Sequence, residues 1–222
     1  MIRITGLSHR ILSIPDLTLP SGIVAVIGPN GGGKTTLLRL VAGIDIPSEG
    51  EILVEGTPPR GRETGWVGEN PGETMVFTRV YDEIASPLRF RRDPCSRVDE
   101  RVTEVAEKLG MSDLLGRETG TLSSGEKARV ALAAALAADP DLLVLDEADS
   151  NLDQESTIGM MDTIRRSSCS QVIEATQRMG LASSADHIVF LEGGRVVHSG
   201  RPAAVLAALS GTPFSHPREG CL

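Results

Sequence analysis

Aromatic residues and cysteines are both scarce in this sequence. Aromatic side chains make up 3% of the 222 residues, whereas hydrophobic residues make up 40%. The hydrophobic core must therefore be built mainly from aliphatic side chains. The three cysteines, Cys95, Cys169 and Cys221, are far apart, odd in number and without the spacing of metal ligands. They predict a protein of the reducing cytosol rather than one held by disulfide bonds.

Positive charge is also in short supply. The formal net charge is −8 at pH 7, and no basic stripe runs along the chain. A general surface for nucleic acid needs such a stripe. The sequence therefore predicts no nucleic-acid partner.

Long hydrophobic runs are missing as well. Charged residues and proline interrupt the first 20 residues before any apolar run develops, so no signal peptide is expected. The longest apolar stretch, residues 130–138, is rich in alanine and too short to cross a bilayer. Any role at a membrane must therefore come through a partner protein.

The most informative stretch is Gly28-Pro29-Asn30-Gly31-Gly32-Gly33-Lys34-Thr35-Thr36, which fits the phosphate-binding pattern G-x-x-x-x-G-K-[ST]. A β-branched apolar run precedes it at residues 23–27, and a helical pattern follows at 37–42, so the motif has the strand-loop-helix context it needs. The glycines let backbone N–H groups turn toward the phosphates, and the helix N-terminus adds partial positive charge. The residues expected around the phosphates are Asn30, Gly31, Gly32, Gly33, Lys34, Thr35 and Thr36. Lys34 is expected to reach the β- and γ-phosphates and Thr35 to ligate Mg²⁺, so the sequence predicts binding of a nucleoside triphosphate.

Strand and helix patterns predict an α/β chain with a helical insertion. Strands are expected at residues 2–4, 17–19, 23–27, 51–54, 64–67, 142–145, 171–175 and 187–191. Helices are expected at residues 37–42, 80–85, 97–109, 126–138 and about 155–166. The turns among the first strands favour a small antiparallel layer, and the later alternation of strands and helices implies a parallel sheet covered on both faces. The last residues, rich in proline, glycine and serine, predict a loose tail.

A second motif ends the strand at residues 142–145 with two carboxylates, Asp146 and Glu147. They fall at the edge of the sheet where α/β proteins place their ligands. Asp146 is expected to hold Mg²⁺ through water, and Glu147 to orient and deprotonate the attacking water. An apolar strand ending in Asp-Glu is weak evidence alone, but it becomes strong when it follows a phosphate loop by about a hundred residues.

A third motif is Leu122-Ser123-Ser124-Gly125-Glu126-Lys127. Ser123 or Ser124 caps the helix that follows, and the N-terminus of that helix could face an anion or simply be a capped end. With the two earlier motifs, this segment resembles the nucleotide-binding subunit of an ATP-binding cassette (ABC) transporter. It is similar to that family's Leu-Ser-Gly-Gly-Gln signature, with Ser124 and Glu126 as departures. The resemblance extends over residues 7–202.

The resemblance implies a fold and a domain plan. The fold is an α/β P-loop NTPase with a RecA-like parallel sheet core, an antiparallel β layer and an inserted α-helical subdomain. The chain is then one ABC ATP-binding domain over residues 1–222. Its nucleotide-binding core takes residues 1–70 and 140–209, its helical signature subdomain residues 71–139, and its tail residues 210–222.

The family also implies a dimer, either of two copies or with a paralogue. Each ATP lies between the phosphate loop of one subunit and the signature helix of the other, as suits a two-fold interface. The signature residues expected to contact it are Ser123, Ser124, Gly125 and Glu126. The segment Ser150-Asn151-Leu152-Asp153 is similar to the D-loop, whose Asp153 communicates with the opposite subunit. The cofactors implied are ATP and Mg²⁺, and the subunit is expected in the cytoplasm, on the inner face of the membrane through an integral membrane transporter partner.

Three positions depart from the family pattern. Glu69 replaces the glutamine of the Q-loop; it could still ligate Mg²⁺ but adds negative charge near the γ-phosphate. Gln177 replaces the switch histidine; its amide can donate to phosphate but cannot titrate near neutral pH. The aromatic residue that stacks on adenine is missing, and His9 either stacks in its place or is a surface residue. His187, in the next strand, is expected to be a structural histidine.

The segment from Glu69 to Ile84 indicates the subtype within the ABC family. It resembles energy-coupling factor (ECF) transporters and cobalt and nickel importers, matching at Asn70, Pro71, Val80, Glu83 and Ile84 but not at Glu69 or Arg79. This implies an ATPase that powers import of a vitamin or metal ion.

The alternatives are a regulatory ATP-dependent dimerisation clamp with little turnover, or the ATPase of another ABC class. Glu147 favours the enzyme, whereas Glu69 and Gln177 favour the clamp, and a heterodimer in which a paralogue supplies better residues would reconcile the two. The missing coiled-coil insertion disfavours DNA-repair ABC ATPases, and the single cassette disfavours translation factors.

Overall fold

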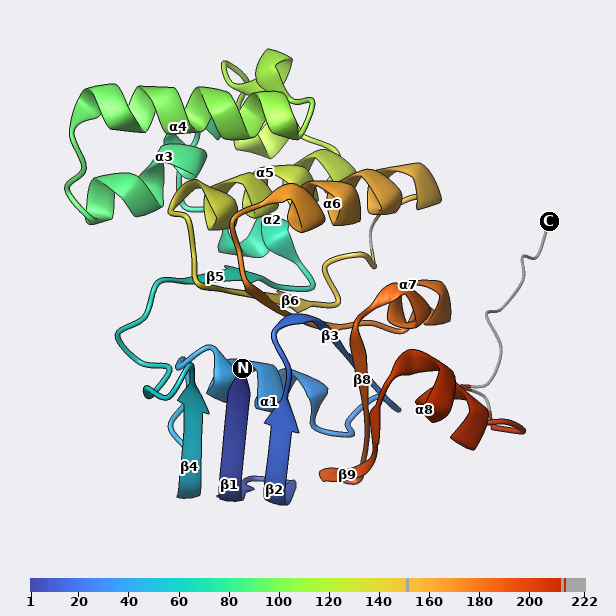
Figure 1. Ribbon diagram of the computed structural model, residues 1–222. Helices are drawn as coiled ribbons and strands as arrows, with labels where there is room; N and C mark the ends of the chain where they lie inside the picture. Colours follow the sequence, from blue (N-terminus) through green and yellow to red (C-terminus); the bar gives the residue numbers. More distant parts are fainter. Residues whose placement is uncertain (151, 213, 215–222) are drawn as a thin grey trace. The chain divides into compact units, whose positions relative to one another are not determined.

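The computed structural model describes residues 1–150, 152–212 and 214 (Figure 1). The chain divides into two compact units. The first comprises Met1–Arg62, Val144–Glu147 and Ser170–Leu222, and the second comprises Glu63–Leu143 and Ala148–Cys169. The predicted helical part, residues 71–139, lies within the second unit, which also includes residues 148–169. The predicted tail falls largely on residues 213 and 215–222, outside the described residues.

The first unit contains the predicted antiparallel layer. Strand β1 (Ile2–His9) lies between β2 (Leu12–Leu19) and β4 (Glu49–Val54) and pairs antiparallel with both. Alternate residues such as Ile2 and Ile4 are fully buried, because a strand sends successive side chains to opposite faces. The layer seen at the foot of Figure 1 therefore follows the predicted pattern, with longer strands.

The parallel core is also confirmed. Strand β3 (Gly22–Ile27) runs parallel to β7 (Gln171–Ala175) on one side and to β8 (His187–Glu192) on the other. The strand order continues from β7 to β6 (Leu142–Asp146) and from β8 to an antiparallel edge strand, β9 (Arg195–Gly200). Strand β3 is buried from Ile23 to Ile27, as expected for a strand with sheet on both sides.

Three helices accompany these strands. Helix α1 (Lys34–Val41) contacts β7 and β4. Helix α7 (Met179–Ser184) contacts β3, and α8 (Pro202–Ala208) contacts α7, β8 and β9. The end of β3 and the start of α1 flank the phosphate loop, and the end of β6 carries Asp146 and Glu147, so this unit holds two of the three sequence motifs.

The second unit is mostly helical. Strand β5 (Thr64–Val67) is the neighbour of β6, whose first residues belong to this unit, and it packs against α5 (Ser124–Ala137). The other elements are α2 (Pro71–Thr74), α3 (Val80–Phe90), α4 (Cys95–Lys108), α6 (Gln154–Arg166) and the 3₁₀ helices η1 (Ser112–Leu114) and η2 (Thr119–Thr121). Helices α2, α3 and α4 all contact α5. No helix in the described ranges is long and apolar enough to span a membrane.

Several predicted boundaries were wrong. Strand β2 begins at Leu12 rather than at residue 17, because Pro15 is tolerated on an edge strand of the antiparallel layer, where its missing N–H breaks no ladder. Strand β4 begins at Glu49 rather than at residue 51. Helix α3 continues through Pro87 to Phe90; the Ser86 hydroxyl donates to the carbonyl of Glu83, four residues before the proline, at 2.8 Å, and so satisfies the acceptor that Pro87 cannot reach.

Candidate nucleotide-binding site

The phosphate loop joins β3 to α1 in the first unit, and two of its glycines are required by the geometry. Gly28 has φ of 145°, and a Cβ there would lie 2.0 Å from the Leu191 carbonyl oxygen. Gly33 has φ of 103° and is the N-cap of α1, without a side-chain cap. The first turn of α1 therefore presents backbone N–H groups that no capping side chain covers, which is the arrangement that binds phosphate at a helix N-terminus.

Lys34, the first residue of α1, is 5% exposed. Its Nζ donates to the carbonyls of Gly28 at 3.0 Å and Pro29 at 3.2 Å, and it lies 3.5 Å from Oε1 of Glu147. The ammonium group is thus held inside the loop by three oxygens. Because a phosphate oxygen would be a further acceptor for the same group, Lys34 is placed to exchange protein oxygens for those of a nucleotide.

Thr35 and Asp146 meet beside this loop. The Thr35 hydroxyl donates to Oδ1 of Asp146 at 3.1 Å, and Asp146, at the end of β6, is 6% exposed. A hydroxyl and a carboxylate are the hard oxygen ligands that Mg²⁺ takes when phosphates and water supply the rest of its shell. These two predicted metal ligands are brought together and fit the ion.

Glu147 follows Asp146 and has an unusual backbone. Its φ is 51°, in the left-handed region that non-glycine residues adopt rarely, and its N–H donates to the Ala175 carbonyl at 3.0 Å. Oε2 of Glu147 accepts from Nε2 of Gln177 at 2.8 Å. The same nitrogen donates to Oδ1 of Asn30 at 3.1 Å. Glu147 is therefore held between Lys34 and Gln177, directly beside the phosphate loop.

This contact changes the interpretation of Gln177. A glutamine amide nitrogen carries two N–H groups, and here one faces Glu147 and the other Asn30. Both donors are used within the protein. Gln177 is therefore placed to position the carboxylate, and in this arrangement it has no further N–H for a phosphate.

The signature segment lies in the second unit, where the alternatives for its cap are resolved. Ser123 is the N-cap of α5, and its Oγ accepts from the Glu126 N–H at 3.3 Å. Oε2 of Glu126 accepts from the Ser123 N–H at 2.7 Å, which completes a capping box. Ser124 and Gly125 lie in the first turn. The backbone hydrogen bond from Ser123 is the main reason that the pKa of Glu126 is lowered.

One residue near the signature was not predicted. Nη1 of Arg117 donates to Oε1 of Glu126 at 2.9 Å. Nine residues separate the two, a spacing that marks no motif, so sequence reasoning had no signal for this pair.

The contacts of the remaining predicted residues do not test the roles predicted for them. Glu69 is exposed in the second unit after β5, and its role as a Mg²⁺ ligand stays a prediction. Asp153 is the N-cap of α6 and accepts from the Ser156 N–H at 2.7 Å, whereas Asn151 of the D-loop lies outside the described residues. His9 is half-buried, with Nδ1 3.1 Å from the Ser48 hydroxyl oxygen, so its proposed stacking on adenine also stays a prediction.

His187 fits the structural role expected for it. Its Nε2 lies 2.8 Å from Oγ of Ser199 on the paired strand, and burial lowers the pKa of its imidazole. A half-buried ring on β8 that is hydrogen-bonded to the paired strand fits such a role.

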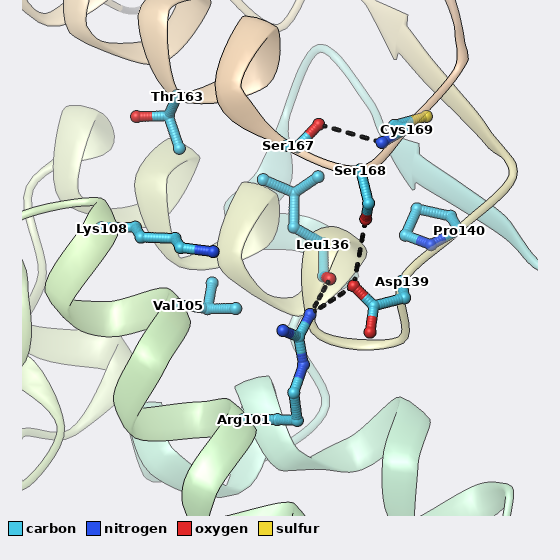
Figure 2. Close-up of a pocket in the computed structure, with 10 residues that line it drawn as sticks. All are labelled: Arg101, Val105, Lys108, Leu136, Asp139, Pro140, Thr163, Ser167, Ser168 and Cys169. Carbon is cyan, nitrogen blue, oxygen red and sulfur yellow. Dashed lines mark hydrogen bonds and ion pairs between the residues drawn. The ribbon is translucent and has the colours of Figure 1, made fainter.

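A small pocket in the second unit is not a second ligand site (Figure 2). Its volume is about 30 Å³, room for about one water molecule. Its largest cation, Arg101, is already engaged: the guanidinium donates to the carbonyls of Leu136 and Ala137 at the end of α5 and to Asp139. The pocket therefore marks a helix C-terminus closed by an arginine side chain.

A phosphate loop with a buried lysine, a threonine–aspartate pair and a glutamate after the strand define a P-loop NTPase. Comparison with known proteins gives the family. Residues 13–150 match the family model described as ABC transporter. The chain is 35% identical over 201 residues to the energy-coupling factor transporter ATP-binding protein EcfA1 of Halalkalibacterium halodurans, covering 86% of this chain and 72% of that protein. It is 37% identical over 213 residues to the nickel import ATP-binding protein NikO of Rhodobacter capsulatus, covering 86% and 84%.

Among solved structures, cbiO1 from Clostridium perfringens, described as part of the ABC transporter complex cbiONQ, superimposes with a TM-score of 0.83 at 25% identity, covering 93% of this chain and 90% of that one. The chain therefore belongs to the ABC transporter family. Within it, the chain is an ATP-binding subunit, an ABC ATPase, and the predicted resemblance is confirmed.

Proposed function

We propose that this chain hydrolyses ATP to power an importer of the energy-coupling factor or nickel type, and so drives uptake of a vitamin or metal ion. The names of the relatives support the transporter class. The observation that carries the chemistry is the cluster in which Lys34, Glu147 and Gln177 meet at the phosphate loop. A clamp without turnover would not need a carboxylate held at this point.

The residues divide the work as follows. The N–H groups at the start of α1 and Lys34 bind the β- and γ-phosphates, and Lys34 leaves its loop carbonyls to do so. Thr35 and Asp146 would hold Mg²⁺, which neutralises phosphate charge when bound. Glu147 accepts a proton from the attacking water, and Gln177 holds its carboxylate in place. Asn30 fixes the Gln177 amide from the side of the loop.

We place this chain in a complex with two kinds of partner. A second ATPase subunit, a copy or a paralogue, supplies its signature helix to the ATP, because the phosphate loop provides only one face of the family's site. An integral membrane subunit is coupled to ATP hydrolysis by this chain. Through that partner the chain lies in the cytoplasm at the inner face of the membrane. The name of the cbiO1 structure, with its cbiONQ complex, supports this assembly.

Phosphate release tests the proposal. Purified chain, alone and mixed with a candidate paralogue, should release phosphate from MgATP, and Glu147→Gln should abolish most of that release while MgATP binding persists. Binding without release by the wild-type protein, both alone and mixed with the paralogue, would instead support the clamp.

A further inference from the structure

We propose that Arg117 is a positioning residue for the signature helix: it offsets the charge of Glu126, so that the N-terminus of α5 can receive an ATP phosphate held by the partner subunit. The inference rests on the proposed function, because it needs the ATP-bound dimer. It concerns this chain in particular, which has a glutamate where the family signature has a neutral glutamine.

The problem that Arg117 solves is electrostatic. A helix N-terminus carries the equivalent of about half a positive charge. The Glu126 carboxylate lies in the first turn of α5 and carries a full negative charge, more than enough to cancel it. Such a carboxylate stabilises the helix but repels the phosphates that the signature must meet. A glutamine would complete the same capping box without this repulsion.

Arg117 supplies the missing positive charge at the right atom. Its Nη1 lies 2.9 Å from Oε1 of Glu126, the carboxylate oxygen that is not used by Ser123. Its Nη2 donates to the Thr121 carbonyl at 3.2 Å. The guanidinium is thus fixed between the capping box and the segment that enters it, and the end of α5 regains a net positive character.

The backbone around Arg117 is also held. Its carbonyl accepts from the Val80 N–H at 3.1 Å, and its N–H donates to the Leu114 carbonyl at 2.9 Å. Two residues later, buried Thr119 donates its N–H to the Thr78 carbonyl at 2.8 Å and its hydroxyl to the Phe77 carbonyl at 2.9 Å. The side chain is partly exposed, 42%, but it extends from an anchored backbone. An unanchored surface arginine would not hold one geometry so well.

The test is a double-mutant cycle on Arg117 and Glu126, with ATP-dependent dimerisation as the measured quantity. All variants carry the background substitution Glu147→Gln, which is expected to retain ATP. Sedimentation measures the ATP concentration for half-maximal dimerisation of Arg117→Gln, Glu126→Gln and the double variant. A paralogue is added if the chain does not self-associate. Arg117→Gln should weaken assembly about two- to fivefold, the range of a partly exposed ion pair, and more at low salt. Glu126→Gln should assemble at least as well as the background, and the double variant should match it, because without the carboxylate no charge needs offsetting.

Two controls separate this role from folding. Lys108→Gln removes one positive charge from another exposed pair of the second unit, with Glu104 at 2.6 Å, and should leave assembly unchanged. Arg117→Lys keeps the charge and should retain most of the effect. Binding of MgATP to the isolated monomer, measured by calorimetry, should be the same in every variant.

The outcomes are distinguishable. Equal weakening by Arg117→Gln with and without Glu126→Gln, or weakening independent of salt, would show a purely structural role and overturn the inference. If the background variant binds MgATP but never assembles, with or without a paralogue, the two-subunit site of the proposed function is wrong, and the inference falls with it.

Discussion

Replacing Gln177 by histidine tests the catalytic cluster most directly. In the structure both N–H groups of the Gln177 amide are engaged, one by Glu147 and one by Asn30. We therefore expect the γ-phosphate to lack the donor that the family resemblance assigns to a histidine at this position. We expect hydrolysis by the wild-type chain to be present but slow, because Glu147 remains available as the base.

The size of the effect follows from one hydrogen bond. A charge-assisted bond to the reacting phosphate contributes on the order of 1.5 kcal/mol, which corresponds to about a tenfold rise in kcat. KM should change less, since the bond matters most as charge develops in the transition state. Only imidazolium gives the full gain, so the gain should be largest below the ordinary histidine pKa of about 6.5 and should decline above it.

Steady-state phosphate release at saturating MgATP, followed across pH, measures both predictions. Gln177→Asn is the matched control: it keeps the amide but shortens its reach to Glu147, and should lower kcat without adding a pH-dependent limb. The reasoning is refuted if the purified wild-type chain already hydrolyses ATP rapidly and Gln177→His leaves kcat unchanged or lowers it. Gln177 would then be a competent substitute for histidine.

Three further predictions follow from the described contacts. Lys34→Ala should weaken MgATP binding about tenfold or more, because it removes the buried cation of the phosphate loop; unchanged affinity by calorimetry would count against the loop assignment. Glu147→Gln should trap an ATP-bound dimer in sedimentation, since an amide oxygen can still accept from Gln177; monomers alone, with and without a paralogue, would contradict it. The lowered pKa of Glu126 means that the stability it contributes is present above the ordinary glutamate pKa of 4.5 and is lost as pH falls through the lower folded-state value. The unfolding temperature of wild-type protein should therefore fall more steeply in acid than that of Glu126→Gln.

The parts of the site that are short contiguous motifs could be predicted from the sequence. The phosphate loop and the Asp146–Glu147 pair each follow an apolar strand, so their place at the sheet edge could be predicted. The link between Asn30 and Gln177 could not, because 147 residues separate them and only the adjacency of β3 and β7 brings them together. The same limit applies to Arg117 and Glu126.

The elements that were missed have weak patterns for physical reasons. Strand β9 is an edge strand on which no residue is fully buried, so it lacks the apolar alternation of a core strand. Helix α8 is rich in alanine and buries only Val205, and α7 is six residues long with no capping side chain. Neither helix repeats an apolar face long enough to show a period.

The backbone at Glu147 places stability and activity in opposition at a single residue. A left-handed conformation costs a residue with a Cβ about 1 kcal/mol or more, whereas glycine adopts it freely and asparagine tolerates it. Selection for a stable fold alone would favour glycine or asparagine after Asp146. The chain instead has a glutamate there. Its left-handed backbone lowers the stability of the fold, but its carboxylate lies beside the phosphate loop. A thermostabilising screen on this protein should therefore return position 147 among its hits, and those hits should be inactive.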